Sequence, residues 1–158
     1  ETILTKNNEL SAADLQQSVS ESSTLKAFIV SNDEKEKGDR ALLNFGHTYG
    51  HAFEAIQSLE GFSHGQAVGL GMICASHLSF LLKKISSDEF EKIKNLIKSA
   101  GLPHEIPENF DVNDFIEAMS RDKKILDKKL RFITLRGLGS AEITEDPPED
   151  LVLKSINL

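Results

Sequence analysis

Hydrophobic residues recur at helical spacing in residues 87–100. The apolar positions there are Phe90, Ile93, Leu96, Ile97 and Ala100. Because side chains three and four residues apart lie on one side of an α-helix, this pattern predicts an amphipathic helix that buries one face. Gly101 and then Pro103 follow it, and these residue types commonly end a helix.

Residues 65–82 form the longest apolar run of the chain. Four polar side chains interrupt it, namely Gln66, Ser76, His77 and Ser79. A membrane span needs about 20 predominantly apolar residues, so we interpret residues 66–82 as a buried core helix. The preceding "SLEGFSHG", residues 58–65, is predicted to be a loop.

Two further helices are predicted before this loop. Ser11 and Asp14 have the spacing of a capping box, which starts a helix running towards Asn32. Its expected inner face consists of Leu15, Val19 and Leu25. Residues 40–57 are also predicted to be one helix, although they contain Gly46 and Gly50. Because each glycine costs about 1 kcal/mol in a helix interior, we expect another segment to approach this backbone closely.

The C-terminal third predicts one more helix, a hairpin and a short final helix. Asp111 and Asp114 open the helix, and "LRFITLRGLGSAEITED", residues 130–146, has strand composition around a glycine-containing turn. Pro147 is expected to start the last helix. The fold class predicted for the whole chain is mainly α, one helical domain with a small β-hairpin.

Composition agrees with a globular domain, argues against nucleic-acid binding and favours a reducing compartment. The chain has 158 residues, 39% hydrophobic and 27% charged, enough for one buried core. The net charge of -7 argues against a nucleic-acid surface. Cys74 is the one cysteine, so an internal disulfide is excluded, a reducing compartment is favoured and a buried, inert thiol is expected. The polar, acidic N-terminus has no signal-peptide pattern. Because the chain begins at Glu1 rather than Met, we expect it to be part of a larger protein.

Three histidines close together carry the candidate chemistry. His47 and His51 are four residues apart, the spacing by which two imidazoles on one helix can bind a metal ion, and His64 follows beside Gly65. A zinc peptidase would have glutamate directly after the first histidine, but Thr48 occupies that position. Spacing by itself therefore proposes all three histidines as ligands of a metal that does not serve peptidase chemistry.

Arg40 and Asn44 extend the polar face of the predicted helix. With His47 and His51 they follow i, i+4, i+7, i+11 spacing and would form one polar stripe. Cationic and amide groups suit a phosphate or carboxylate, which arginine can bind through two hydrogen bonds. We expect these side chains to line one cleft, with His64 beside His47.

The segment "KAFIVSNDEKEKGDRALLNFGHTYGHAFE", followed by "HGQAVGLGM" and "RDKK", resembles the C-terminal domain of 3-dehydroquinate synthase. The resemblance covers essentially the whole chain. One departure is Gln66, which occupies a position where the family commonly has glutamate.

The resemblance implies a role for each matching residue. His47 and His64 match the two histidine ligands of the catalytic zinc (or another divalent metal such as cobalt), whereas His51 matches a substrate contact. His51 and Glu36, an acidic residue near the reacting centre, are the implied catalytic residues. The implied substrate contacts are Lys26, Arg40, Asn44, His51 and one of Lys123 and Lys124. The family's third zinc ligand, a glutamate, and a further catalytic lysine would precede Glu1.

The resemblance also implies an architecture and a reaction. Residues 1–158 would form the single C-terminal α-helical domain of a two-domain enzyme whose N-terminal domain binds NAD. That enzyme converts 3-deoxy-D-arabino-heptulosonate 7-phosphate to 3-dehydroquinate and phosphate. We expect a cytoplasmic homodimer with no nucleic-acid or membrane partner. The alternatives are a related sugar-phosphate cyclase, a metal-dependent polyol dehydrogenase domain, or a helical binding module without catalysis.

Overall fold

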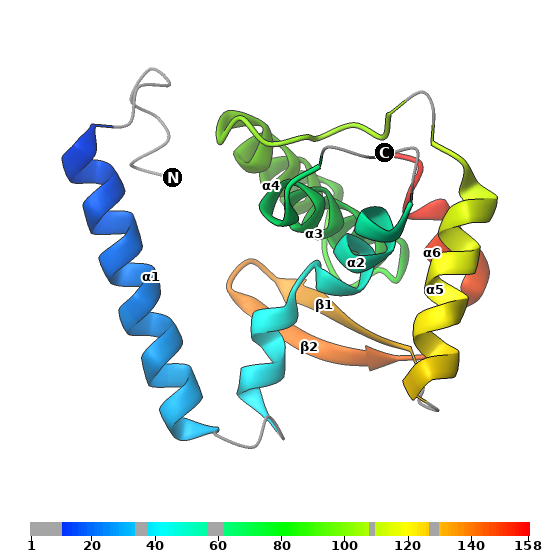
Figure 1. Ribbon diagram of the computed structural model, residues 1–158, viewed down its shortest axis with the longest axis horizontal. Helices are drawn as coiled ribbons and strands as arrows, with labels where there is room; N and C mark the ends of the chain where they lie inside the picture. Colours follow the sequence, from blue (N-terminus) through cyan, green and yellow to red (C-terminus); the bar gives the residue numbers. More distant parts are fainter. Residues whose placement is uncertain (1–10, 34–37, 57–61, 108–109, 127–129) are drawn as a thin grey trace.

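Most of the described residues lie in helices, and the two strands found among them form a hairpin (Figure 1). The computed structural model describes residues 11–33, 38–56, 62–107, 110–126 and 130–158, with only the backbone at 39 and 120–126. The elements are α1 (Ala12–Asn32), η1 (Asp39–Asn44), α2 (His47–Ala55), α3 (His64–Leu81), α4 (Ser87–Ser99), α5 (Val112–Leu126), β1 (Arg131–Gly137), β2 (Ser140–Glu145) and α6 (Glu149–Lys154). The predicted fold class, mainly α with a small hairpin, is confirmed.

Helix α3 forms the centre of the core. It packs against α2, α4, α6 and strand β1, and most of its side chains are buried. Ser63 and Gln66 form a capping box at its start, which places His64 at its first helical position rather than in the predicted loop. Cys74 is fully buried, and burial raises the pKa of its thiol, as expected for an inert cysteine. Among the described residues, no helix is both long and apolar enough to cross a bilayer.

Glycines allow α2 and α3 to pack backbone against backbone. A Cβ atom on Gly71 would lie 2.8 Å from the backbone nitrogen of Gly50 and against the carbonyl oxygen of Gly46. A Cβ atom on Gly46 would lie 2.8 Å from the carbonyl oxygen of Val68. Such distances leave no room for a side chain, so the expected close approach to the 40–57 backbone is confirmed.

The prediction of one helix over residues 40–57 is wrong. Residues 39–44 form the 3₁₀ helix η1, and Phe45 and Gly46 separate it from α2. Gly46 has a left-handed φ of 83°, which glycine adopts without strain and which interrupts an α-helix. Arg40 and Asn44 therefore do not continue the helical stripe of His47 and His51.

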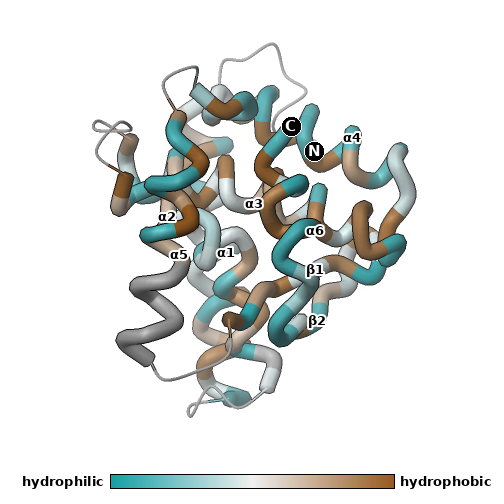
Figure 2. The backbone as a smooth tube through the Cα atoms, turned by 90° about the vertical axis from the view of Figure 1, so that its right-hand side faces the viewer, coloured by the Kyte–Doolittle hydropathy of each residue, from teal (hydrophilic) through white to brown (hydrophobic). Residues whose placement is uncertain are grey.

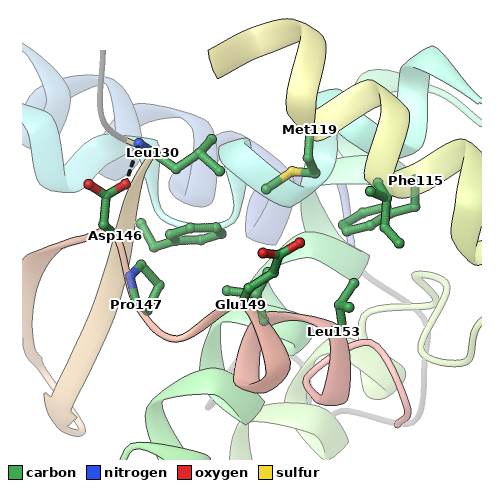
Figure 3. Close-up of a pocket in the computed structure, with 10 residues that line it drawn as sticks. Phe115, Met119, Leu130, Asp146, Pro147, Glu149 and Leu153 are labelled. Atoms are coloured by element: carbon green, nitrogen blue, oxygen red, sulfur yellow. Dashed lines mark hydrogen bonds between the residues drawn. The ribbon is translucent and has the colours of Figure 1, made fainter. Parts of the chain in front are cut away.

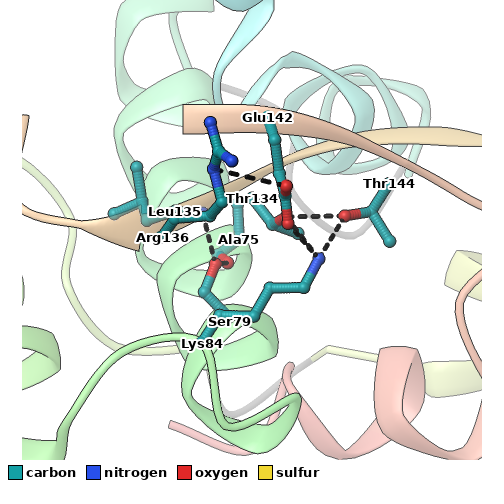
Figure 4. Close-up of polar contacts among 8 residues, drawn as sticks. All are labelled: Ala75, Ser79, Lys84, Thr134, Leu135, Arg136, Glu142 and Thr144. Atoms are coloured by element: carbon teal, nitrogen blue, oxygen red, sulfur yellow. Dashed lines mark hydrogen bonds and ion pairs between the residues drawn. The ribbon is translucent and has the colours of Figure 1, made fainter. Parts of the chain in front are cut away.

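Polar contacts hold the hairpin against α3 and against Lys84, which follows the end of α3 (Figure 4). Strands β1 and β2 pair antiparallel, with Ile133 opposite Ile143. The Ser79 hydroxyl accepts a hydrogen bond of 2.9 Å from the Leu135 N–H. Lys84 donates to the hydroxyl of Thr144 at 2.6 Å and forms an ion pair of 2.7 Å with Glu142. The hydrogen bond from Lys84 holds the pKa of the Glu142 carboxyl below its ordinary value.

The outer helices agree with the predictions unevenly. In Figure 2, hydrophilic and hydrophobic residues alternate along α4, where Phe90 and Ile97 are buried. Helix α1 begins with the predicted capping box. Among the described elements, η1 is the one with which α1 makes substantial contact, and α1 lies apart from the other helices in Figure 1. Its expected inner face is exposed, with Leu15 at 50% and Val19 at 65%. The last helix begins at Glu149, two residues later than predicted.

Candidate functional site

Helix α2 has one buried face and one polar face. The contacts of the buried face set the direction in which the polar face points. Tyr49 and Phe53 are fully buried in the core. The Tyr49 hydroxyl is 2.6 Å from that of Ser155, which itself donates to the Val152 carbonyl, so Tyr49 is the donor. The Thr48 hydroxyl donates to the Arg131 carbonyl at 2.7 Å. These contacts anchor α2 to α6 and to β1, and they hold its opposite face in a defined direction.

The three clustered histidines meet where α2 faces the start of α3. The ring centroids of His47 and His64 are 5.5 Å apart, and those of His47 and His51 are 5.8 Å apart. The His51 and His64 rings are 6.3 Å apart. Since His64 is separated from the α2 histidines in sequence, the close packing of α2 on α3 is what brings it beside His47, as expected.

Glu54 adds a carboxylate to this cluster. Its Oε1 lies 2.9 Å from Nδ1 of His64, which joins the last turn of α2 to the first residue of α3. An ionised carboxylate only accepts hydrogen bonds, so this contact places the proton of a neutral His64 ring on Nδ1. The other nitrogen, Nε2, then carries a free lone pair, as a metal ligand requires.

His47 has a nitrogen that fits a metal ligand. Its Nδ1 is buried and has no hydrogen-bond partner among the described residues. A buried polar atom left unpaired costs about 1–3 kcal/mol, which a bound cation would relieve. Two imidazoles bound to one tetrahedral zinc ion at about 2.1 Å have ring centroids about 5 Å apart. The 5.5 Å separation of the His47 and His64 centroids is close to this distance.

A complete metal site does not occur within the described part of the chain. No three His, Cys, Asp or Glu side chains there are arranged to hold one metal ion. The three-histidine site suggested by spacing is thus not formed in this structure. The two-histidine assignment for His47 and His64 stays a prediction and requires a ligand from elsewhere.

The remaining predicted site residues lie on other elements. Arg40, half-buried, and Asn44, exposed, belong to η1, which also packs against the hairpin. Lys26 is exposed on α1, the helix that contacts η1. The Asp33 carboxylate accepts hydrogen bonds from the backbone N–H groups of Gly38 and Arg40 and so joins α1 to η1.

Two of the predictions concern residues whose side chains the structure does not describe. Glu36 lies outside the described residues. Lys123 and Lys124 belong to α5, but only their backbone is described. The catalytic role of Glu36 and the choice between the two lysines stay predictions.

Sequence reasoning missed Glu54. The available signal was its position seven residues after His47, about two helical turns, which places both side chains on one face of α2. Its contact with His64 depends on how α2 meets α3, which spacing does not reveal.

An apolar cavity of about 320 Å³ lies between α5, the hairpin and α6 (Figure 3). Its lining includes Phe115, Met119 and Leu153. The Asp146 carboxylate, which also lines it, accepts a hydrogen bond from the Leu130 N–H. Of the predicted site residues whose side chains the structure describes, none lines this cavity. It therefore adds nothing to the histidine site.

The amino-acid sequence of this chain is similar to those of known 3-dehydroquinate synthases. The chain is 41% identical over 133 residues to 3-dehydroquinate synthase of Vibrio atlanticus, which covers 84% of this chain and 37% of the relative. It is 43% identical over 142 residues to 3-dehydroquinate synthase of Acinetobacter baumannii, which covers 90% of this chain and 39% of the relative. The chain thus spans about two fifths of the length of these curated relatives.

Solved structures share the fold. A 2-deoxy-scyllo-inosose synthase in complex with carbaglucose-6-phosphate, NAD+ and Co2+ matches with a TM-score of 0.72 and 27% identity, covering 85% of this chain and 39% of that one. The 2-epi-5-epi-valiolone synthase of Streptomyces hygroscopicus, with NAD+ and Zn2+ bound, matches with a TM-score of 0.68 at 21% identity over 81% of this chain and 35% of that one, a likeness of fold alone. The family model described as 3-dehydroquinate synthase C-terminal matches residues 1–125. The chain belongs to the 3-dehydroquinate synthase C-terminal family.

Proposed function

We propose that this chain is the metal- and substrate-binding domain of a two-domain 3-dehydroquinate synthase. The whole enzyme would convert 3-deoxy-D-arabino-heptulosonate 7-phosphate to 3-dehydroquinate and phosphate in the shikimate pathway, which leads to aromatic amino acids. The observation that carries the proposal is the His47–His64 pair, with ring centroids 5.5 Å apart, in a chain of this family. A cytoplasmic homodimer is part of the same proposal.

The proposed cofactors are NAD and a divalent metal, zinc or cobalt. His47 and His64 would hold the metal, and a third ligand would come from a part of the protein outside this chain. The solved 2-deoxy-scyllo-inosose synthase carries NAD+ and Co2+, which supports both cofactors for a relative of this fold. Bound there, the metal would act as a Lewis acid on a substrate hydroxyl, while NAD would accept a hydride and later return it.

The chain's own polar residues would orient the substrate. The guanidinium of Arg40 suits the phosphate or carboxylate of the substrate, and the Asn44 amide and Lys26 ammonium suit its oxygens. His51, whose ring centroid is 5.8 Å from that of His47, would contact the substrate and exchange a proton with it. Glu36 and one of Lys123 and Lys124 complete the proposed set.

A second candidate is a related sugar-phosphate cyclase. The 27% identity to a 2-deoxy-scyllo-inosose synthase bound to a sugar-phosphate analogue favours it. The two candidates differ in the substrate they take. Phosphate release from the heptulosonate phosphate, with none from glucose 6-phosphate, would support the first, and the opposite result would support the second.

Substitution of the two α2 histidines tests the metal assignment in the whole gene product. We expect His47→Ala to remove the metal and the activity together, because it deletes a ligand. His51→Ala should lose activity but keep most of the metal, because His51 is assigned to the substrate. Metal content by atomic emission and phosphate release are the measurements, and equal metal loss in both variants would make His51 a ligand.

A further inference from the structure

The contact between Glu54 and His64 connects two elements at the histidine cluster. Glu54 lies in the last turn of α2, and His64 is the first residue of α3. The 2.9 Å distance between Glu54 Oε1 and His64 Nδ1 is that of a charge-assisted hydrogen bond. His64 is the more exposed of the two, with 60% of its side chain accessible against 33% for Glu54. An exposed imidazole would rotate freely unless a partner held it.

We propose that Glu54 is a positioning residue that sets the ring orientation and the tautomer of His64 for metal binding. The inference rests on the proposed role of His64 as a ligand. Because the carboxylate only accepts, the neutral His64 ring carries its proton on Nδ1 and keeps the lone pair of Nε2 free. Without this partner both tautomers of the ring are available, and only one of them leaves Nε2 unprotonated.

The packing of α2 supports this role. Glu54 follows His47 by seven residues, so both side chains project from one face of α2. The glycine contacts between α2 and α3 fix the distance between this face and His64. Glu54 and His47 therefore approach the His64 ring from the same helix, one as a hydrogen-bond acceptor at Nδ1 and the other as its neighbour at 5.5 Å between centroids.

A purely stabilising ion pair is the competing explanation. Exposed pairs of this kind contribute little to folding stability, and salt screens them. A metal-ligating histidine, in contrast, commonly donates its second N–H to a carboxylate, and removing that carboxylate typically lowers metal affinity about 10–100-fold. The two explanations thus differ in whether metal affinity or folding stability responds to Glu54.

The experiment compares Glu54→Ala and Glu54→Gln with the unsubstituted whole gene product by Co2+ titration, followed by visible absorption. We expect Glu54→Ala to weaken Co2+ binding about 10–100-fold with little change in melting temperature. Glu54→Gln should weaken it less, because the amide carbonyl can still accept from Nδ1–H. Glu105→Ala is the matched control, since Glu105 also lies beside a histidine, His104, at 3.8 Å, and Co2+ affinity should not change.

The histidine tautomer provides a second readout that does not need the metal. In metal-free protein labelled with ¹⁵N-histidine, His64 should be protonated at Nδ1, and Glu54→Ala should give a mixture of tautomers. Unchanged Co2+ affinity and an unchanged tautomer in both Glu54 variants would overturn this inference and leave the proposed function intact. Failure of the unsubstituted protein to bind Co2+ would instead overturn the metal site and this inference with it.

Discussion

At the residue scale, the space around single glycines determines how the site is built. Gly46, Gly50 and Gly71 lie where α2 and α3 touch, and a Cβ at any of them would come within about 3.1 Å of neighbouring backbone atoms. Gly65, in the first turn of α3, has nothing within 4 Å of a Cβ. Gly46, Gly50 and Gly71 are therefore required for the close packing of the two helices, whereas Gly65 is not.

Gly71→Ala should destabilise the protein. Alanine gains about 1 kcal/mol in helix propensity, but its methyl group would overlap the α2 backbone, which must shift at a larger cost. We expect a net loss of about 2 kcal/mol or more in the free energy of unfolding, measured by urea denaturation. Gly65→Ala is the control from the same helix and should be neutral or stabilising by up to about 1 kcal/mol. Equal effects of the two substitutions would contradict the close packing.

At the scale of elements, buried hydroxyl groups join the hairpin to the core. Ser76 and Ser79 are both fully buried on α3. Ser76 donates within its own helix to the Met72 carbonyl, whereas Ser79 donates to the Ala75 carbonyl and also accepts from the Leu135 N–H of β1. Of these two serines, Ser79 is the one whose described hydrogen bonds join two elements, and Figure 4 shows its contact with Leu135.

Ser79→Ala should therefore weaken the hairpin's attachment. It leaves the half-buried Leu135 N–H without its 2.9 Å acceptor, which should cost about 1–2 kcal/mol. Ser76→Ala removes a hydroxyl of equal burial without leaving an N–H unpaired and should cost less than about 1 kcal/mol. Unfolding free energies of the two variants, together with hydrogen exchange at Leu135, measure the difference. If the Leu135 amide exchanged faster in Ser76→Ala than in Ser79→Ala, the prediction that Ser79 attaches the hairpin would be wrong.

At the scale of the whole molecule, the chain has a core but only part of the proposed site. The core cluster includes Tyr49, Phe53, Leu70, Phe115 and Phe132, drawn from α2, α3, α5 and β1. As proposed ligands, His47 and His64 would supply two of the three protein ligands that a catalytic zinc normally has. Folding and catalysis are therefore expected to separate in this chain.

This chain in isolation should fold cooperatively, be catalytically inert and bind zinc poorly. Folding follows from its core, and inertness follows because hydride transfer needs the nicotinamide, for which this sequence has no Gly-rich βαβ unit. Thermal unfolding by circular dichroism measures the first property. Phosphate release with the heptulosonate phosphate, NAD and zinc measures the second, with the whole gene product as the positive control. Turnover by the isolated chain at an ordinary enzymatic rate would refute this prediction.

The amphipathic and apolar patterns of the sequence were sufficient for much of the fold. The helical spacing around Phe90 and Ile97, the apolar run of α3 and the strand composition of residues 130–146 each predicted the element that the structure contains. These patterns suffice because an element that buries one face needs apolar residues at the spacing of that element, which differs between helix and strand. The glycines of residues 40–57 also indicated the close approach that occurs at Gly46 and Gly50, whereas the polar site at the histidines stays a prediction.

Tertiary packing decided the rest. Helix propensity could not predict the break at Gly46, because its left-handed backbone allows contact with α3, which is distant in sequence. The apolar residues of α1 suggested a buried face, but exposure depends on what packs against a helix, and among the described elements α1 makes substantial contact only with η1. The hydrogen bond from His64 to Glu54 likewise exists because α2 ends where α3 begins in space. The sequence determined which residues are candidates for the chemistry, and the packing of α2 on α3 determined which of them meet.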